Sequence, residues 1–221
     1  MLARRLVASL WIEEPALTEE AARCACADGA DEIMLLLDDP AGTSTLASVI
    51  ESTARQACLP VTACLPTSSF SDFETLVRAG AERVYLDDVT EPNLLNQAAA
   101  AFGRQIVGIA VDLIAGNAGE APAWAIRMHG ARQPIAANTL AELAARGAGE
   151  LLVRLVGVEP CAAALAIRTA ARAAATEALR CLLLEAEADG LVWNPPWMPG
   201  MTSLLQLKQY LAAAGFVVRG G

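Results

Sequence analysis

Five aspartates follow directly on apolar runs that have the character of buried strands: Asp38 and Asp39, Asp87 and Asp88, and Asp112. Carboxylates that converge in one cleft can bind a hard cation or act as general acid and base. A regular strand directs only one member of each Asp-Asp pair inward. We therefore predict Asp112, Asp87 and Asp38 as the catalytic set, with Asp87 and Asp112 facing the pocket. The alternative is that these carboxylates cap helices or face solvent.

Three tryptophans also fall at or just beyond predicted strand ends, namely Trp11, Trp193 and Trp197. Together they are expected to line a pocket, either one that takes an aromatic ligand or a vacated site that the indoles fill. Trp197, in a rigid Pro-rich loop, is also a candidate partner contact. The single histidine, His129, is expected to have a structural role in its loop, with titration near neutral pH as the alternative.

A repeated sequence pattern indicates the helices and strands that must position these residues. Four similar phrases, at 29–32, 80–83, 147–150 and 187–190, each combine Gly and Ala with an acidic residue. Each follows an Ala-rich stretch and leads into an apolar run. This pattern is typical of a helix that ends at Gly before a buried parallel strand begins.

The whole chain accordingly alternates strands with helices, and a hairpin-like insertion is expected around 124–129. Ser71, before Asp72 and Glu74, is a helix-start signal. Strict alternation predicts a parallel sheet, and eight such units close a TIM-type (βα)8 barrel. The predicted strands are 4–11, 32–38, 60–65, 83–87, 105–112, 150–156 and one near 191, and the predicted helices are 17–28, 44–58, 70–79, 91–102 and 136–146.

The alternation fails near the C-terminus. Only about 33 residues separate the strand 150–156 from the strand near 191. Two parallel crossovers need about a dozen residues each, plus a strand between them. We therefore expect an α/β barrel that is incomplete or rearranged between its sixth and eighth strands, with 216–219 as a compensating late strand. No linker composition interrupts the chain, so one domain over 1–221 is predicted.

Composition limits the partners. Hydrophobic residues make up 55% of the chain and aromatic residues 5%, so Ala, Leu and Val must build the core. A net charge of −9 argues against nucleic acid, whose phosphates need a basic surface. The apolar run within 1–11 is too short for a signal peptide, and no membrane span is expected. The chain is predicted to be cytoplasmic.

The cysteines do not suggest a metal site. They form no CxxC pair, and His129 has no cysteine near it in sequence. We expect reduced, buried thiols that act as small hydrophobes, and we expect no metal and no cofactor. The six cysteines are Cys24, Cys26, Cys58, Cys64, Cys161 and Cys181.

Several motifs, in order along most of the chain, resemble the histidine-biosynthesis barrel family, and within it the cyclase subunits (HisF) of imidazole glycerol phosphate synthase, which are lyases. The resemblance implies a TIM barrel whose active site lies at the carboxyl ends of the strands. It also implies a glutaminase partner. The stretches that carry the resemblance are 1–5, 28–33, 76–84, 102–105, 128–132, 147–152 and 207–219.

At the expected active-site end the chain departs from the family. The resemblance implies two acid–base aspartates, at the ends of strands 1 and 5. Asp112 matches the second, but Trp11 stands at the first, and an indole exchanges no proton at neutral pH. The phosphate-binding turns are changed too, since 63–68 has lost its glycines and contains Pro66, and Glu159 would repel phosphate.

At the opposite end the family's pattern is kept. The resemblance implies a ring of one arginine, two glutamates and one lysine where ammonia enters from the glutaminase. The matching residues are Arg5, Glu32, Glu150 and Arg83, the last in place of lysine. Charged residues at strand starts can simply pair and plug a barrel. A structural plug and a retained docking face therefore both stay open.

Three functions follow as hypotheses. The first is a diverged barrel protein without cyclase activity that acts through ligand or partner binding. The second is an enzyme with a new reaction that uses Asp112 with Asp87 or Asp38. The third is a cyclase that retains the family reaction. The expected partner is glutaminase-like or a second copy of the chain, in a homo- or hetero-oligomer, because the shortened region between strands 6 and 8 would leave a sheet edge uncovered.

Overall fold

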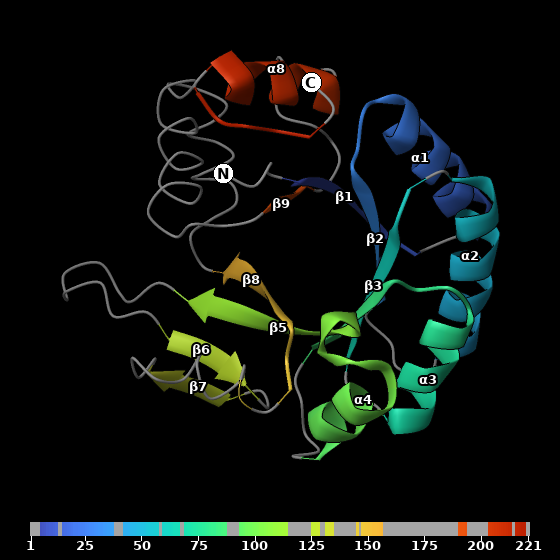
Figure 1. The fold of residues 1–221 in the computed structure, drawn as a ribbon, viewed down its shortest axis with the longest axis vertical. Coiled ribbons are helices and arrows are strands. Elements are labelled where there is room, and N and C mark those ends of the chain that lie inside the picture. The colour runs from blue at the N-terminus through green and yellow to red at the C-terminus, as the bar shows by residue number, and fades with distance from the viewer. Residues whose placement is uncertain are drawn as a thin grey trace. The chain divides into compact units, whose positions relative to one another are not determined.

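The computed structural model describes residues 5–12, 15–37, 42–57, 59–66, 69–87, 93–114, 125–128, 131–134, 145, 147–156, 190–193, 203–213 and 215–219 (Figure 1). The chain divides into two compact units. Unit 1 consists of Met1–Leu35, Ser52–Val61 and Glu159–Gly221. Unit 2 consists of Leu36–Glu51 and Thr62–Val158.

Strands and helices alternate through both units, as the sequence predicts. The predicted hairpin is present as β6 and β7. The elements are β1 (Arg5–Trp11), α1 (Pro15–Ala27), β2 (Glu32–Leu36), α2 (Thr43–Gln56), β3 (Val61–Pro66), α3 (Phe70–Arg78), β4 (Arg83–Asp87), α4 (Leu94–Phe102), the 3-10 turn η2 (Arg104–Ile106), β5 (Val107–Ile114), β6 (Ala125–Met128), β7 (Ala131–Pro134), β8 (Glu150–Val156), β9 (Gly190–Trp193) and α8 (Leu204–Ala213).

Two of the repeated phrases begin where a helix ends, at Gly29 after α1 and at Gly80 after α3, and Gly215 ends α8 in the same way. These glycines have φ values of 91°, 109° and 90°, which L side chains rarely adopt. After α1, the amide of Ala30 donates to the carbonyl of Ala25 at 3.0 Å, and the same six-residue closure follows α3 and α8. This is the Schellman arrangement, which satisfies the last helical carbonyls and turns the chain out of the helix.

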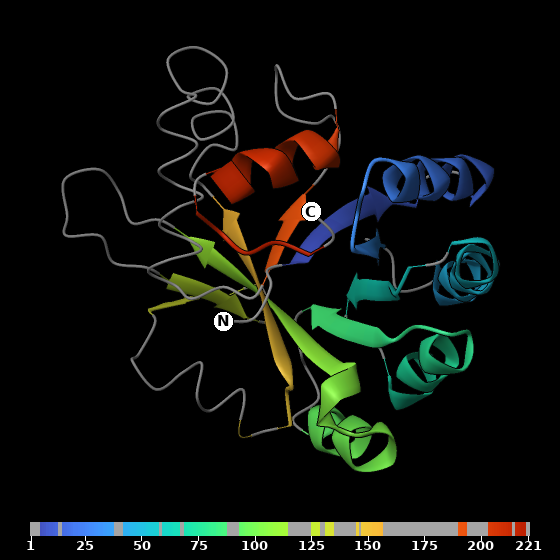
Figure 2. The same cartoon turned by 45° about the horizontal axis from the view of Figure 1, so that its top comes forward.

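In unit 1, β1 lies between β2 and β9, and β1 runs parallel to β9 with Arg5 opposite Gly190 and Ala8 opposite Trp193. Helix α8, red in Figure 2, packs against β1. Leu6 and Ala8 of β1 meet Leu204, Leu207 and Leu211 of α8 in a buried apolar cluster, which Ala25, Ala30 and Phe216 complete.

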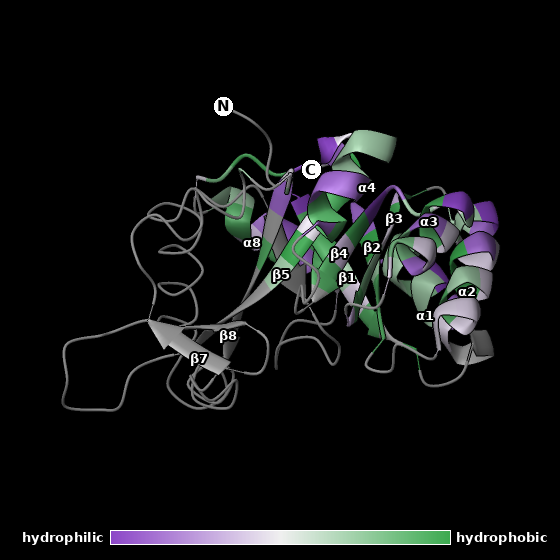
Figure 3. Ribbon diagram, turned by 90° about the horizontal axis from the view of Figure 1, so that it is seen from below, coloured by the Kyte–Doolittle hydropathy of each residue, from purple (hydrophilic) through white to green (hydrophobic). Residues whose placement is uncertain are grey.

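In unit 2, β3, β4, β5 and β8 are parallel neighbours. Strand β8 pairs with one edge of β5 from Gly108 to Ile114. On the other edge, β4 pairs with the first half of β5, and β6 of the antiparallel β6–β7 hairpin pairs with the second half. Strand β4 is coloured mainly as hydrophobic in Figure 3. Its residues Val84, Tyr85 and Leu86 are buried. On the helices, the rings of Phe70 and Phe73 contact Phe102.

Two local predictions were wrong. The cap of α3 is Ser69 rather than Ser71, because the Ser69 hydroxyl is the group that accepts from the Asp72 amide. The expected late strand at 216–219 is reduced to a single bridging residue, Val218. Most of the predicted helix 136–146 and the whole of 157–189, where the seventh strand was in question, lie outside the described residues.

Candidate functional site

The carboxyl ends of β4 and β5 bring two of the predicted aspartates to the same end of neighbouring strands. Asp87 is the last residue of β4 and lies opposite Ala110, two residues before Asp112 on β5. On its two edges Asp112 is in register with Arg127 of β6 and Arg154 of β8. The backbone therefore places one carboxylate residue between two arginine residues, an arrangement that the spacing of residues along the sequence does not predict.

Trp11 and Trp193 fall at strand ends, as the sequence predicts. Trp11 closes β1, and Trp193 closes the neighbouring β9, opposite Ala8. The last residue of β1 is thus an indole residue, at the position where the resemblance implies an aspartate. Asp38, Trp197 and His129 lie outside the described residues, as do Asp39 and Asp88.

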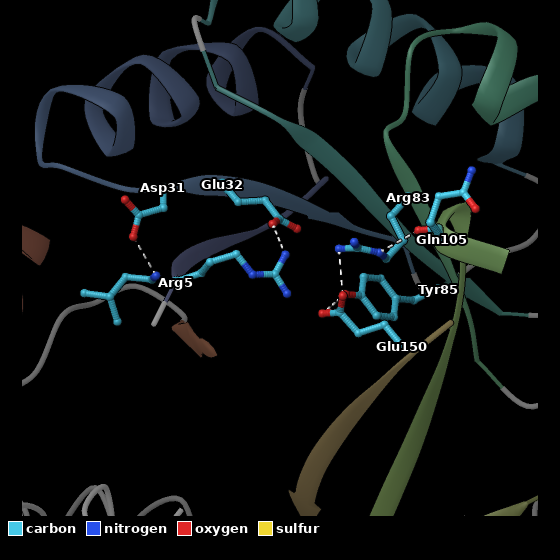
Figure 4. A network of polar contacts seen from close by, with 8 residues as sticks. Arg5, Asp31, Glu32, Arg83, Tyr85, Gln105 and Glu150 are labelled. Atoms are coloured by element: carbon cyan, nitrogen blue, oxygen red, sulfur yellow. Dashed lines mark hydrogen bonds and ion pairs between the residues drawn. The ribbon is translucent and has the colours of Figure 1, made fainter. Parts of the chain in front are cut away.

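At the strand starts of unit 1, two ion pairs connect the starts of β1 and β2 and helix α8, and Figure 4 shows the first of them, Arg5 with Glu32. Arg5 Nη1 lies 2.8 Å from Glu32 Oε2, and the Glu32 side chain is 4% exposed. Next to it, Asp31 Oδ2 accepts the backbone N–H of Leu6 at 2.8 Å. Asp31 Oδ1 accepts Nζ of Lys208 at 2.6 Å, with both side chains less than a tenth exposed. Such pairs hold the strand starts and helix α8 in place, because removing one partner would leave a buried charge without compensation.

At the strand starts of unit 2, Glu150 is the acceptor for two groups on β4 (Figure 4). Arg83 Nη1 lies 3.0 Å from Glu150 Oε2, and the Tyr85 hydroxyl donates to Glu150 Oε1 at 2.8 Å. Arg83 Nε also donates to the carbonyl of Gln105 at 3.2 Å, and its Cζ lies 6.0 Å from the centre of the Tyr85 ring. Gly108, opposite Tyr85, leaves room for this ring.

All four predicted strand-start residues, Arg5, Glu32, Arg83 and Glu150, are therefore in ion pairs, and each pair lies within one unit. The carboxylates are engaged by guanidinium groups and, for Glu150, by a phenol. This chemistry suits positioning of the strands, and a docking role for the same residues stays a prediction.

Sequence reasoning missed Tyr85, Asp31 and Lys208. Tyr85 is two residues from Arg83 on the same strand, which is the spacing of one strand face. Lys208 is the only lysine of the chain, and its position in an apolar helix signals a buried charge that needs a partner.

Among the cysteines that the structure describes, Cys64 is buried as expected, but Cys24 is exposed on α1, which corrects the prediction that every thiol is buried. In the described part of the chain no group of three or more His, Cys, Asp or Glu residues is placed to hold a metal ion. None of the described helices has the length and apolar character needed to cross a membrane.

Comparison with known proteins supplies the family. The pattern of the family described as histidine biosynthesis protein matches residues 14–190. The chain is 31% identical to imidazole glycerol phosphate synthase subunit HisF of Thermosynechococcus vestitus, over 87% of this chain and 76% of that protein. It is 28% identical to the HisF subunit of Dehalococcoides mccartyi and 30% identical to that of Gluconacetobacter diazotrophicus, over 83% and 81% of those proteins. With this match and its alternating parallel strands and helices, the chain belongs to the histidine biosynthesis family of α/β barrels, as a HisF-like member.

Proposed function

We propose that this chain is a HisF-like barrel protein that has lost the cyclase reaction and acts by binding a ligand or a protein partner. The observation that carries the proposal is Trp11 at the end of β1. The resemblance to the cyclases implies an aspartate there, paired with the one at Asp112. Ring closure needs one group to donate a proton while another accepts it, and an indole does neither at neutral pH.

The size of the expected effect follows from the same chemistry. A positioned general acid or base contributes between about a hundredfold and ten-thousandfold to a rate. The altered turn 63–68 and Glu159 in this sequence add a loss of phosphate affinity at the expected loops. Because these changes are independent and fall at one end of the strands, they support loss of the reaction more than a single substitution would.

The surface that we expect to bind a partner lies at the amino ends of the strands, opposite the expected active site. Arg5 with Glu32 and Arg83 with Glu150 keep the charged pattern that the resemblance associates with a glutaminase-facing surface. We propose that a glutaminase-like subunit docks at the strand starts, and that a second copy of this chain, where it is the partner, covers the shortened region between the sixth and eighth strands. Light scattering at micromolar concentration, alone and with a glutaminase subunit, tests this, and a monomer in both samples would contradict it.

The positions of two aspartates favour a second candidate function, that of an enzyme with a new reaction. Asp87 and Asp112 stand at the same end of neighbouring parallel strands, where barrels hold their catalytic groups. Two carboxylates of this kind can divide acid and base roles when their surroundings differ. An enzyme with a new reaction is therefore the alternative, and in it Asp112 and Asp87 would touch the substrate.

The first experiment is a cyclase assay with the family's bisphosphate substrate and ammonium salt, which removes the need for a glutaminase. We expect no turnover by the natural chain. Trp11→Asp restores the missing carboxylate, and Trp11→Phe is its matched control, because it changes the same indole without adding an acid. Turnover by the natural chain that disappears in Asp112→Asn would overturn the proposal and establish a retained cyclase.

A further inference from the structure

Two consecutive acidic residues at the start of β2 bind two different elements of unit 1. Glu32, the first residue of β2, pairs with Arg5 of β1 at 2.8 Å. Asp31, one residue earlier, pairs instead with Lys208 of helix α8 at 2.6 Å. A single step along the backbone therefore connects α8 to the Arg5–Glu32 pair at the strand starts.

Asp31 also holds the backbone of β1 directly beside Arg5 (Figure 4). Its Oδ2 accepts the amide of Leu6 at 2.8 Å, and its own amide donates to the carbonyl of Leu6 at 2.8 Å. The Leu6 amide belongs to the planar peptide unit that begins at the Cα of Arg5. Fixing this N–H fixes the plane, and with it the position from which the Arg5 side chain leaves the strand. The direction of Arg5 toward Glu32 therefore depends on the Asp31 carboxylate.

The Asp31 carboxylate depends in turn on α8. Its two oxygens are divided between two donors, since Oδ2 accepts the Leu6 amide and Oδ1 accepts Nζ of Lys208. The side chains of Asp31 and Lys208 are 9% and 4% exposed. A buried carboxylate that loses its cation is left without compensation and is driven toward water. Such a movement would weaken the hydrogen bond that Asp31 accepts from the Leu6 amide.

Apolar contacts hold α8 against β1 as well, and they are separate from the ion pair. The side chain of Leu6 lies in one buried cluster with Leu207 and Leu211 of α8. Truncating one of these leucines loosens the packing of the helix but leaves the charged groups of Asp31 and Lys208 in the chain. The polar connection and the apolar contact can therefore be distinguished by substitution.

We propose that Asp31 is a positioning residue for the surface at the strand starts, and that it aligns Arg5 with Glu32 only while Lys208 holds its carboxylate. The inference rests on the proposed function, because this is the surface at which we expect a glutaminase-like subunit to bind. It gives α8 control over that surface through a buried lysine. The seating of α8 and the binding of the partner are then linked, and each favours the other.

The test compares Lys208→Met with Leu211→Ala in the full chain, at a temperature where circular dichroism shows that both are folded. Leu211→Ala is the matched control, because it also loosens α8 but keeps the Lys208–Asp31 pair. The readouts are the NMR signal of the Arg5 Nε–Hε group, identified by its absence in Arg5→Lys, and the Kd for a glutaminase subunit from a relative. We expect Lys208→Met to shift the Arg5 signal and to weaken binding at least about tenfold, the effect of one lost charge-assisted contact. Leu211→Ala should change neither.

An unshifted Arg5 signal in Lys208→Met, or an equal shift in Leu211→Ala, would overturn the inference. If Lys208→Met does not fold, Asp31→Asn takes its place, because it removes the charge that holds Lys208 but keeps an oxygen for the Leu6 amide. It should shift the Arg5 signal in the same direction by a smaller amount, and no shift would count equally against the inference. The two proposals fail separately: a natural chain that binds no glutaminase subunit contradicts the proposed docking, and the Arg5 signal still decides the role of Asp31.

Discussion

At the residue scale, the single lysine of the chain makes the sharpest prediction of stability. Lys208 and Asp31 form a pair whose side chains are 4% and 9% exposed. Removing one member of a buried pair costs about 3 to 5 kcal/mol, because the remaining charge is left without compensation. Lys208→Met should therefore lower the free energy of unfolding by about 3 kcal/mol, measured by urea denaturation.

The exposed pair Arg78–Glu74 on α3 is the matched control, because its arginine is 74% exposed. Arg78→Met should cost at most about 0.5 kcal/mol. Asp31→Asn, made alone and in the Lys208→Met background, completes a double-mutant cycle that isolates the interaction energy of the pair. A Lys208→Met variant that unfolds at the same urea concentration as Arg78→Met would show that the pair contributes no stability.

Gly108 makes a second prediction at this scale. A Cβ at this position would lie 2.3 Å from Cδ1 of Tyr85, closer than any real carbon contact. Tyr85 is 2% exposed and its hydroxyl is bound to Glu150, so the ring has little freedom to retreat. Gly108→Ala should destabilise the chain by about 1 to 3 kcal/mol through overpacking.

The companion variant is Tyr85→Leu, which removes the crowding ring. The cost of Gly108→Ala should shrink in the Tyr85→Leu background, and thermal unfolding of the four proteins measures the coupling. Additive losses would mean that the backbone shifts to accommodate the methyl group and that the ring does not require glycine.

At the element scale, helix α3 is held at its start by one side chain. The Ser69 hydroxyl accepts the Asp72 amide at 3.2 Å and donates to Asp72 Oδ2 at 2.6 Å. Loss of such a cap costs about 1 kcal/mol, so Ser69→Ala should lower the midpoint of urea unfolding measurably. Ser71→Ala, at an exposed position of the same turn, should leave it nearly unchanged. Equal effects of the two changes would contradict the assignment of Ser69 as the cap.

The elements themselves could largely be predicted because their signals are local. Gly29, Gly80 and the apolar runs that follow them specify where helices stop and strands start, and the structure agrees within a few residues. The α3 cap could not be placed, since Ser69 and Ser71 carry the same chemistry two residues apart. The register that places Asp112 between Arg127 and Arg154 could not be predicted either, because strand register is a long-range property and depends on how β6 and β8 pair with β5.

At the scale of the whole molecule, the borders between the two units argue for one domain over 1–221. They fall inside regular elements: between Leu35 and Leu36 of β2, between Glu51 and Ser52 of α2, and between Val61 and Thr62 of β3. Separate domains normally meet at exposed linkers that few contacts cross. A helix cannot melt in one half and remain in the other without losing the hydrogen bonds across the border, so we propose that the units fold together.

The prediction is therefore that a change in either unit destabilises both. Lys208→Met alters unit 1 and Gly108→Ala alters unit 2. Each should shift the urea transitions followed by far-ultraviolet circular dichroism and by tryptophan fluorescence, and the two probes should stay coincident, as cooperative unfolding requires. If the probes separate, and Lys208→Met moves one transition while Gly108→Ala moves the other, the units unfold independently. The Arg5–Glu32 pair would then belong to one folding unit and the Arg83–Glu150 pair to the other.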